Sequence, residues 1–181
     1  MFEVKSQVVI RILGYFFLNP NKQNYINELA KILEIDPGNL DKKLKELEID
    51  GLLASEPRGN QKYYFLNKRF PLLKETESLY NFKYGFKQIL ANTIKKIDDI
   101  EDVYIFGSYA KGGFGNDSDI DLLLIGNHSS IEAKKKLSKI EKQIGREINL
   151  VNMTKEELSS KRKNKDEFID NIFTNKIIKI L

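Results

Sequence analysis

The stretch VYIFGSYAKGGFGNDSDIDLLLIG, residues 103–126, is the most informative part of this sequence. It begins as a short apolar run, breaks at Gly107-Ser108, continues through several glycines and returns as a second apolar run that contains Asp119 and Asp121. Short apolar runs bounded by turn residues indicate buried strands. Because a buried carboxylate costs free energy unless a cation meets it, the stretch predicts two core strands that meet at a metal site.

The spacing of the two aspartates predicts what this site does. Alternate residues of a strand share a face, so Asp119, Asp121 and Leu123 point the same way. Two adjacent carboxylates can hold a pair of Mg²⁺ ions about 3.5 to 4 Å apart, which clamp a triphosphate and an attacking hydroxyl during phosphoryl transfer. At Gly107 the backbone can approach a phosphate closely, and the Ser108 hydroxyl can donate to its oxygens. We therefore predict a phosphate site at Gly107 and Ser108 that faces a metal site at Asp119 and Asp121.

Gly107-Ser108, ten further residues and Asp119-x-Asp121 together resemble the signature of the nucleotidyltransferase superfamily, which includes DNA polymerase beta, kanamycin nucleotidyltransferase and the minimal nucleotidyltransferases. FGSYAKG and SDIDLLLIG are similar to the small prokaryotic members. The resemblance extends over residues ~100–181. It implies a small mixed sheet flanked by helices, Mg²⁺ or Mn²⁺ as the metal, and transfer of a nucleoside monophosphate from an NTP, with ATP favoured, to an acceptor hydroxyl.

The sequence departs from this family at a third acidic position. Family members carry a third carboxylate on the strand that follows the next helix, where it binds metal and helps to activate the acceptor hydroxyl. Residues 130–143 fit that helix, REINLVNM fits that strand, and the matching position holds Asn149. Glu147 lies two residues earlier on the same face of the strand and is our candidate for the third catalytic carboxylate beside Asp119 and Asp121. The alternative is that Glu147 is an ordinary edge charge.

The first 70 residues show a different pattern. SQVVIRILGYFFL (6–18) and NYINELAKILEI (24–35) have apolar residues at helical spacing. In DPGNLDKKLKELEIDGLL, Asp36 can cap a third helix, Pro37 can open it and Gly51 can end it. Two extended runs then follow around Pro57-Arg58-Gly59-Asn60, which predicts a hairpin.

INELAKILEIDPGNLDKKLKELEIDGLL resembles the framework of winged helix-turn-helix transcription regulators. The resemblance implies that the third helix enters the major groove of double-stranded DNA and that the hairpin touches the backbone or the minor groove. The DNA contacts that it implies, on the third helix and the hairpin, are Asn39, Lys42, Lys43, Arg58 and Lys62. The alternative is that residues 1–70 form a small helical module for dimerisation. In that case these five residues are polar or charged side chains exposed to solvent.

The whole chain is therefore predicted to be an α+β protein with three parts. Residues 1–70 form the winged helix-turn-helix domain, residues 71–100 form one amphipathic linker helix with a weak point at Gly85, and residues 101–181 form the nucleotidyltransferase domain. The composition agrees with this, because 41% of the 181 residues are hydrophobic and 31% are charged. The net charge of +4 divides evenly between residues 1–70 and 71–181, so any DNA binding depends on local placement of charge.

Several classes of site are excluded or disfavoured. The chain has no cysteine and one histidine, so disulfides and thiolate metal sites are excluded and a metal must be held by oxygen ligands. No apolar run reaches the length of about 20 residues that a membrane span needs, and we expect a cytoplasmic protein without a membrane partner.

Two functions remain open at this point. The resemblance to minimal nucleotidyltransferases points to an enzyme with a protein acceptor such as a toxin of the HEPN fold, and the winged helix would add regulation of its own transcription. The alternative is a transcription regulator whose nucleotidyltransferase-fold domain binds nucleotide with weak or no catalysis, which Asn149 favours. A homodimer is expected in either case, because helix-turn-helix readers pair across two half-sites.

Overall fold

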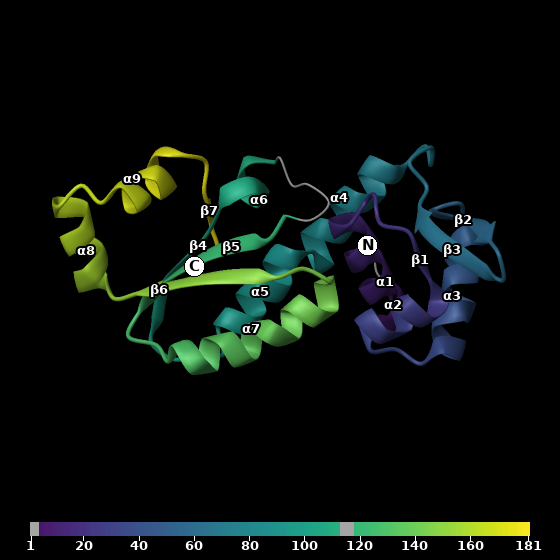
Figure 1. Cartoon of the computed structure of the whole chain (residues 1–181), viewed down its shortest axis with the longest axis horizontal. Coiled ribbons are helices and arrows are strands. Elements are labelled where there is room, and N and C mark those ends of the chain that lie inside the picture. Colours follow the sequence, from purple (N-terminus) through teal and green to yellow (C-terminus); the bar gives the residue numbers. More distant parts are fainter. Residues whose placement is uncertain (1–3, 113–117) are drawn as a thin grey trace. The chain divides into compact units, whose positions relative to one another are not determined.

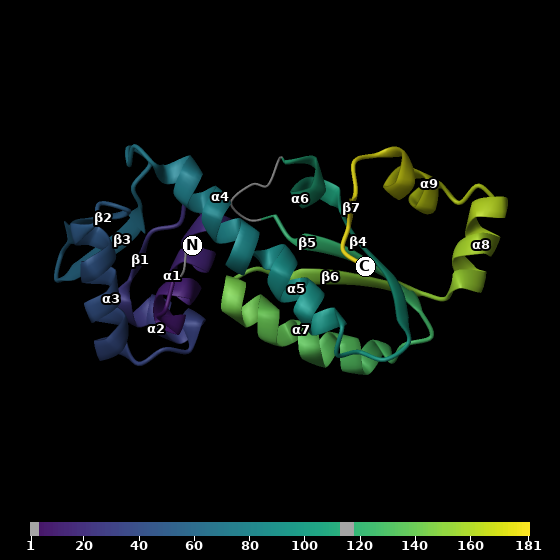
Figure 2. The ribbon, with the colours of Figure 1, turned by 180° about the vertical axis from the view of Figure 1, so that it is seen from behind.

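The computed structural model describes residues 4–112 and 118–181, so residues 113–117 of the glycine-rich segment lie outside the description. The chain forms two compact units. The N-terminal unit comprises Met1–Gln88 and Lys142–Gly145, and the C-terminal unit comprises Ile89–Glu141 and Arg146–Leu181. Figures 1 and 2 show the elements of each unit from opposite sides. Within the described ranges, no helix has the length and apolar character that crossing a membrane requires.

The N-terminal unit combines helices with a small antiparallel sheet in the strand order β1-β3-β2. Its elements are α1 (Gln7–Leu18), β1 (Asn24–Tyr25), α2 (Ile26–Leu33), α3 (Pro37–Ile49), β2 (Leu53–Arg58), β3 (Gln61–Leu66) and α4 (Leu73–Tyr84). The three helices predicted before residue 51 and the hairpin predicted after it are therefore present.

Local signals in the sequence fix the ends of these elements. The Asp36 side chain accepts a hydrogen bond from the backbone N–H of Asn39 at 3.0 Å, and Pro37 opens α3, as predicted. Gly51 follows the helix with φ +80°, a conformation that glycine adopts without strain. The apolar stripes of α1, α2 and α3 meet in one core that includes Phe16, Leu29 and Leu44.

The segment expected to form one linker helix forms two. α4 ends at Tyr84 and α5 (Phe86–Ile94) begins two residues later. Gly85 has an extended backbone, with φ −64° and ψ 166°, which interrupts the helical hydrogen bonds. A Cβ atom at Gly85 would lie 2.6 Å from the backbone oxygen of Asn81, so only glycine fits this break.

The C-terminal unit is built on a mixed sheet in the order β6-β5-β4-β7. The elements of the chain from residue 100 onward are β4 (Ile100–Phe106), α6 (Gly107–Lys111), β5 (Ile120–Gly126), α7 (Ser130–Ile144), β6 (Ile148–Met153), α8 (Lys155–Lys163), α9 (Glu167–Thr174) and β7 (Ile178–Lys179). β4 is antiparallel to β5 and β7, whereas β5 and β6 run parallel. Strands and helices alternate around one sheet, so the expected α+β class and small mixed sheet are found.

Both faces of this sheet are covered. Leu123, Ile125 and Met153 pack against Ile169 and Ile172 of α9, with Leu158 of α8 beside them. α7 lies along the opposite face in both views (Figures 1 and 2). α8, α9 and β7 complete the chain, and α8 was not predicted from the sequence. Thr154 and Glu157 form its capping box, a signal that the sequence does contain.

Candidate functional site

The two aspartates lie at one end of the central strand β5. Asp119 immediately precedes the strand, and Asp121 pairs with Phe106, the last residue of β4. Asp121 shares its face of the sheet with Leu123 and Ile125, whose side chains are buried against α9. Both carboxylates are half-buried. The apolar face of the strand therefore ends in a pair of carboxylates that remain accessible to a cation.

Gly107 lies directly beside one member of this pair, Asp121. It follows β4 with φ +69°, and a Cβ atom built on it would lie 2.1 Å from Oδ2 of Asp121. Any other residue would have to displace the carboxylate and also adopt a strained backbone. Ser108 is the next residue and lies half-buried in α6. The structure thus brings the predicted phosphate-binding glycine against the predicted metal ligand.

Asn149 lies next to both aspartates. The parallel register pairs Asp121 with Asn149 across β5 and β6. The Asn149 side-chain amide donates to Oδ1 of Asp121 at 3.2 Å and to Oδ2 of Asp119 at 3.4 Å. These are weak hydrogen bonds by their length. An amide nitrogen therefore occupies the place beside the pair where the family resemblance implies a third carboxylate.

Glu147 is not gathered into this group. It is exposed and precedes β6, and its backbone carbonyl accepts a hydrogen bond from Ile120 N at 3.0 Å. Among residues 4–112 and 118–181, no three His, Cys, Asp or Glu side chains are placed to hold one metal ion. The neighbouring Arg146 is buried, and its guanidinium donates to the backbone carbonyl of Ser118 at 3.0 Å. Arg146 thereby fixes the segment that leads into Asp119.

A hollow of about 170 Å³ opens beside Gly107. Its lining combines aromatic, amide and cationic side chains from the end of β4, from α6, and from α9 and the residue that follows it: Phe106, Gly107, Lys111, Phe168, Asn171, Ile172 and Asn175. The rings of Phe106 and Phe168 meet edge to face with centroids 6.1 Å apart. The lining residues of α9 were not predicted, although their spacing of three and four residues places them on one helix face.

Some of the predicted DNA-binding residues are exposed, and others are paired with carboxylates of the same unit. Asn39 and Lys42 are exposed on α3. Lys43 pairs with Glu46 at 2.6 Å, and Lys62 pairs with Glu48 at 2.7 Å. The hydrogen bond that Lys62 donates to Glu48 raises the pKa of Lys62 above its usual value.

Arg58, the remaining predicted DNA contact, donates to Glu56 on the same strand. Three of the five predicted contacts are therefore partly neutralised within the unit.

Three solved chains are similar to parts of this chain at a low level. A chain from a crystal structure of a toxin-antitoxin with AMP-PNP is 16% identical, with a TM-score of 0.40 over 53% of this chain and 73% of that one. A putative nucleotidyltransferase from Sulfolobus solfataricus is 22% identical, with a TM-score of 0.29 over 43% and 68%. Lactococcus lactis ZitR, as a C30AH42A mutant, is 21% identical, with a TM-score of 0.36 over 53% and 66%. Similarity at this level supports no statement about function.

The comparison with protein families is more informative. No curated protein sequence matches the chain. A family model matches residues 87–172, which include Gly107, both aspartates, Asn149 and all but one of the residues that line the hollow. This part of the chain therefore matches the nucleotidyltransferase domain, the family that this model describes.

Proposed function

We propose that this protein transfers AMP from ATP to an acceptor hydroxyl in a reaction that depends on Mg²⁺ or Mn²⁺. The observation that carries the proposal is the pair Asp119 and Asp121 against Gly107, in a segment that matches the nucleotidyltransferase domain. Two half-buried carboxylates at the end of a strand fit a hard divalent cation, which prefers oxygen ligands. A bound Mg²⁺ would neutralise negative charge on the triphosphate and on the attacking oxygen.

The residues of the chain have separate roles in this proposal. Asp119 and Asp121 would hold the metal, and Gly107 and Ser108 would bind the nucleotide phosphates through backbone amides and the serine hydroxyl. The aromatic and amide lining of the hollow beside Gly107 suits the nucleoside. The acceptor oxygen forms a bond to the α-phosphorus, the bond to the β-phosphate oxygen breaks, and pyrophosphate leaves. Glu147, which lies apart from the two aspartates in this structure, remains our candidate for the base, and it would take the hydroxyl proton once the acceptor is bound.

We further propose that the acceptor hydroxyl belongs to a partner protein, such as a toxin of the HEPN fold. The test is incubation with radiolabelled ATP, CTP, GTP or UTP and Mg²⁺, with and without the protein encoded by the neighbouring gene. Label from one nucleotide should appear on protein and should disappear in the double variant Asp119→Asn, Asp121→Asn. Asp102→Asn with Glu132→Gln is a matched control, because it removes two carboxylates whose ion-pair partners are lysines elsewhere in the C-terminal unit.

The position of Asn149 favours a second candidate, a regulator that binds nucleotide but transfers it slowly or not at all. An amide cannot accept the acceptor proton and is a weaker metal ligand than a carboxylate. This candidate predicts Mg²⁺-dependent nucleotide binding, measured by calorimetry, without transfer of label to the partner. If the partner acquires label at a rate that the aspartate variants abolish, the second candidate is excluded.

For the N-terminal unit we propose a winged helix-turn-helix that binds double-stranded DNA as a homodimer and regulates its own promoter. The support is the succession of α1, β1, α2, α3 and the hairpin β2–β3, with Asn39 and Lys42 exposed on α3. Lys42→Gln should weaken promoter binding in a mobility-shift assay. It should also lower the slope of log affinity against log salt concentration by about 0.9, the contribution of one phosphate contact. An unchanged slope would remove Lys42 from the interface.

A further inference from the structure

The sheet of the N-terminal unit has an aromatic outer face. Leu53, Tyr64 and Leu66 point into the core and are at most 4% exposed. Their neighbours on the strands point the other way, which places Tyr63 and Phe65 of β3 on the outer face. Tyr25 of β1 pairs with Tyr63, and the two rings meet with centroids 5.6 Å apart.

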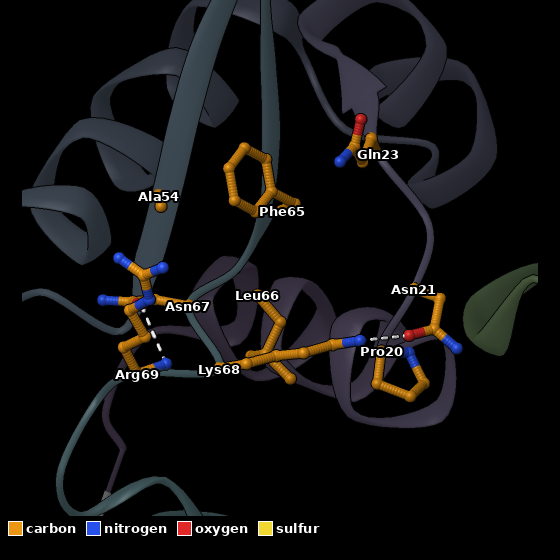
Figure 3. A pocket seen from close by; sticks show the side chains of 9 residues that line it. All are labelled: Pro20, Asn21, Gln23, Ala54, Phe65, Leu66, Asn67, Lys68 and Arg69. Atoms are coloured by element: carbon orange, nitrogen blue, oxygen red, sulfur yellow. Dashed lines mark hydrogen bonds between the residues drawn. The ribbon is translucent and has the colours of Figure 1, made fainter.

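A hollow of about 500 Å³ lies at one end of this face (Figure 3). Its lining joins a few apolar side chains to cations and amides: Pro20, Asn21, Gln23, Ala54, Phe65, Leu66, Asn67, Lys68 and Arg69. Figure 3 shows the Phe65 ring among these side chains. The volume is within the usual range of ligand sites, about 300 to 1,000 Å³. The lining contains two cations and no carboxylate, so it suits a ligand that is both planar and anionic.

A cation also lies at the hairpin end of the face. The Arg58 guanidinium carbon lies 4.8 Å from the centre of the Tyr63 ring. Glu56, which pairs with Tyr63 in the sheet, is a carboxylate on this face, and Arg58 donates to it. Lys68 donates to Asn21, whereas the Arg69 side chain has no acidic partner among the described residues. The aromatic side chains are therefore bordered by Lys68 and Arg69 at the hollow and by the ion pair of Arg58 with Glu56 at the hairpin end.

We propose that this outer face binds single-stranded nucleic acid. Side chains two residues apart on a strand stand about 7 Å apart, so Phe65 and Tyr63 can each stack one base of an extended strand. Every base has an aromatic face, and so the binding would tolerate different sequences. Lys68 and Arg69 at the hollow would meet the phosphates of that strand. In a duplex the bases already stack on one another, which excludes duplex DNA from this mode of binding.

The proposal is tested with a fluorescein-labelled single strand of about 10 nucleotides, within the size range of single-strand sites, and with a duplex of the same sequence. Anisotropy is measured on the full chain in EDTA, which keeps metal-dependent nucleotide binding at Asp119 and Asp121 out of the signal. Phe65→Leu keeps an apolar side chain but removes the ring. It should weaken single-strand binding by about 10-fold, which corresponds to the binding free energy that one base–aromatic stack usually contributes. Arg69→Gln should lower the salt slope by about 0.7, the value for one phosphate of a single strand.

Duplex binding provides the opposite pattern. Lys42→Gln on α3 should weaken binding of promoter duplex and leave single-strand binding unchanged, whereas Phe65→Leu should do the reverse. Thermal unfolding of each variant shows whether it folds. The proposal is overturned if a folded Phe65→Leu variant binds the single strand as the natural chain does. It is also overturned if a mononucleotide binds as tightly as the single strand, because then only the hollow is used.

Discussion

Replacement of Asn149 by aspartate should place a third carboxylate at the proposed metal site. The Asn149 amide nitrogen lies 3.2 Å from Asp121 and 3.4 Å from Asp119. In Asn149→Asp, a carboxylate oxygen replaces the amide N–H group that partly compensates the negative charges of Asp119 and Asp121. We therefore expect a site that is less stable without metal and binds metal more tightly than the natural chain.

The magnitude follows from these distances. Two unit charges separated by 3 to 4 Å repel by about 1 kcal/mol in a water-like dielectric, which applies because the Asn149 side chain is exposed. Two such repulsions and the loss of two long hydrogen bonds give a total of about 2 to 3 kcal/mol. One kcal/mol lowers the melting temperature of a small domain by about 4 to 8 °C. Without metal, Asn149→Asp should therefore melt about 10 °C or more below the natural chain.

Thermal unfolding in EDTA and in Mg²⁺ measures this effect, and the radiolabel assay measures the chemistry. Mg²⁺ at about 100 times its dissociation constant stabilises the site that binds it by about 2.7 kcal/mol, which should recover most of the loss. Asn127→Asp, an equal change in the exposed turn after β5, should show neither effect. If Asn149→Asp melts like the natural chain in EDTA and gains nothing from Mg²⁺, the three side chains do not form one metal site. Faster transfer of label by the variant would identify Asn149 as the residue that limits catalysis.

Two further substitutions test the described packing. Gly107→Ala should lower the free energy of unfolding by about 1 to 2 kcal/mol, because alanine is strained in a left-handed backbone, and its clash with Asp121 should abolish Mg²⁺-nucleotide binding. Gly112→Ala is the control, because Gly112 also has a positive φ but a Cβ atom there would meet nothing within 4 Å. Calorimetry should therefore find nucleotide binding lost in Gly107→Ala and intact in Gly112→Ala. Burial raises the pKa of the Tyr80 hydroxyl, which donates to the Ile10 carbonyl at 2.9 Å. The hydroxyl then ionises more easily in the unfolded chain than in the folded one, so stability should fall as the pH rises above about 10. Tyr80→Phe should lower the free energy of unfolding by about 1 kcal/mol at neutral pH and should remove the share of the alkaline destabilisation that ionisation of Tyr80 causes. If the melting temperatures of the variant and the natural chain fall in parallel from neutral to alkaline pH, this expectation is contradicted.

Much of this protein could be predicted from the sequence because the signals are local. These signals affect only residues a few positions away: the helical spacing of apolar residues, the Asp36 cap, Pro37 at the start of α3 and the turn at Gly59-Asn60. The two apolar runs and the aspartates two residues apart define β4, β5 and the face that carries both carboxylates. A capping box at Thr154 would have revealed α8 by the same kind of reasoning.

The composition of the site depended on contacts between distant segments. The family resemblance placed Asn149 at the third acidic position, but periodicity does not distinguish it from Glu147 as a neighbour of the aspartates. The parallel register of β5 and β6 puts Asn149 against them. The approach of Gly107 to Asp121 and the contribution of α9 to the neighbouring hollow also follow from packing across the sheet. Sequence by itself determined which side chains could bind metal and phosphate. Tertiary structure alone decided which of them meet, because their partners lie far along the chain and are joined only by strand pairing and side-chain packing.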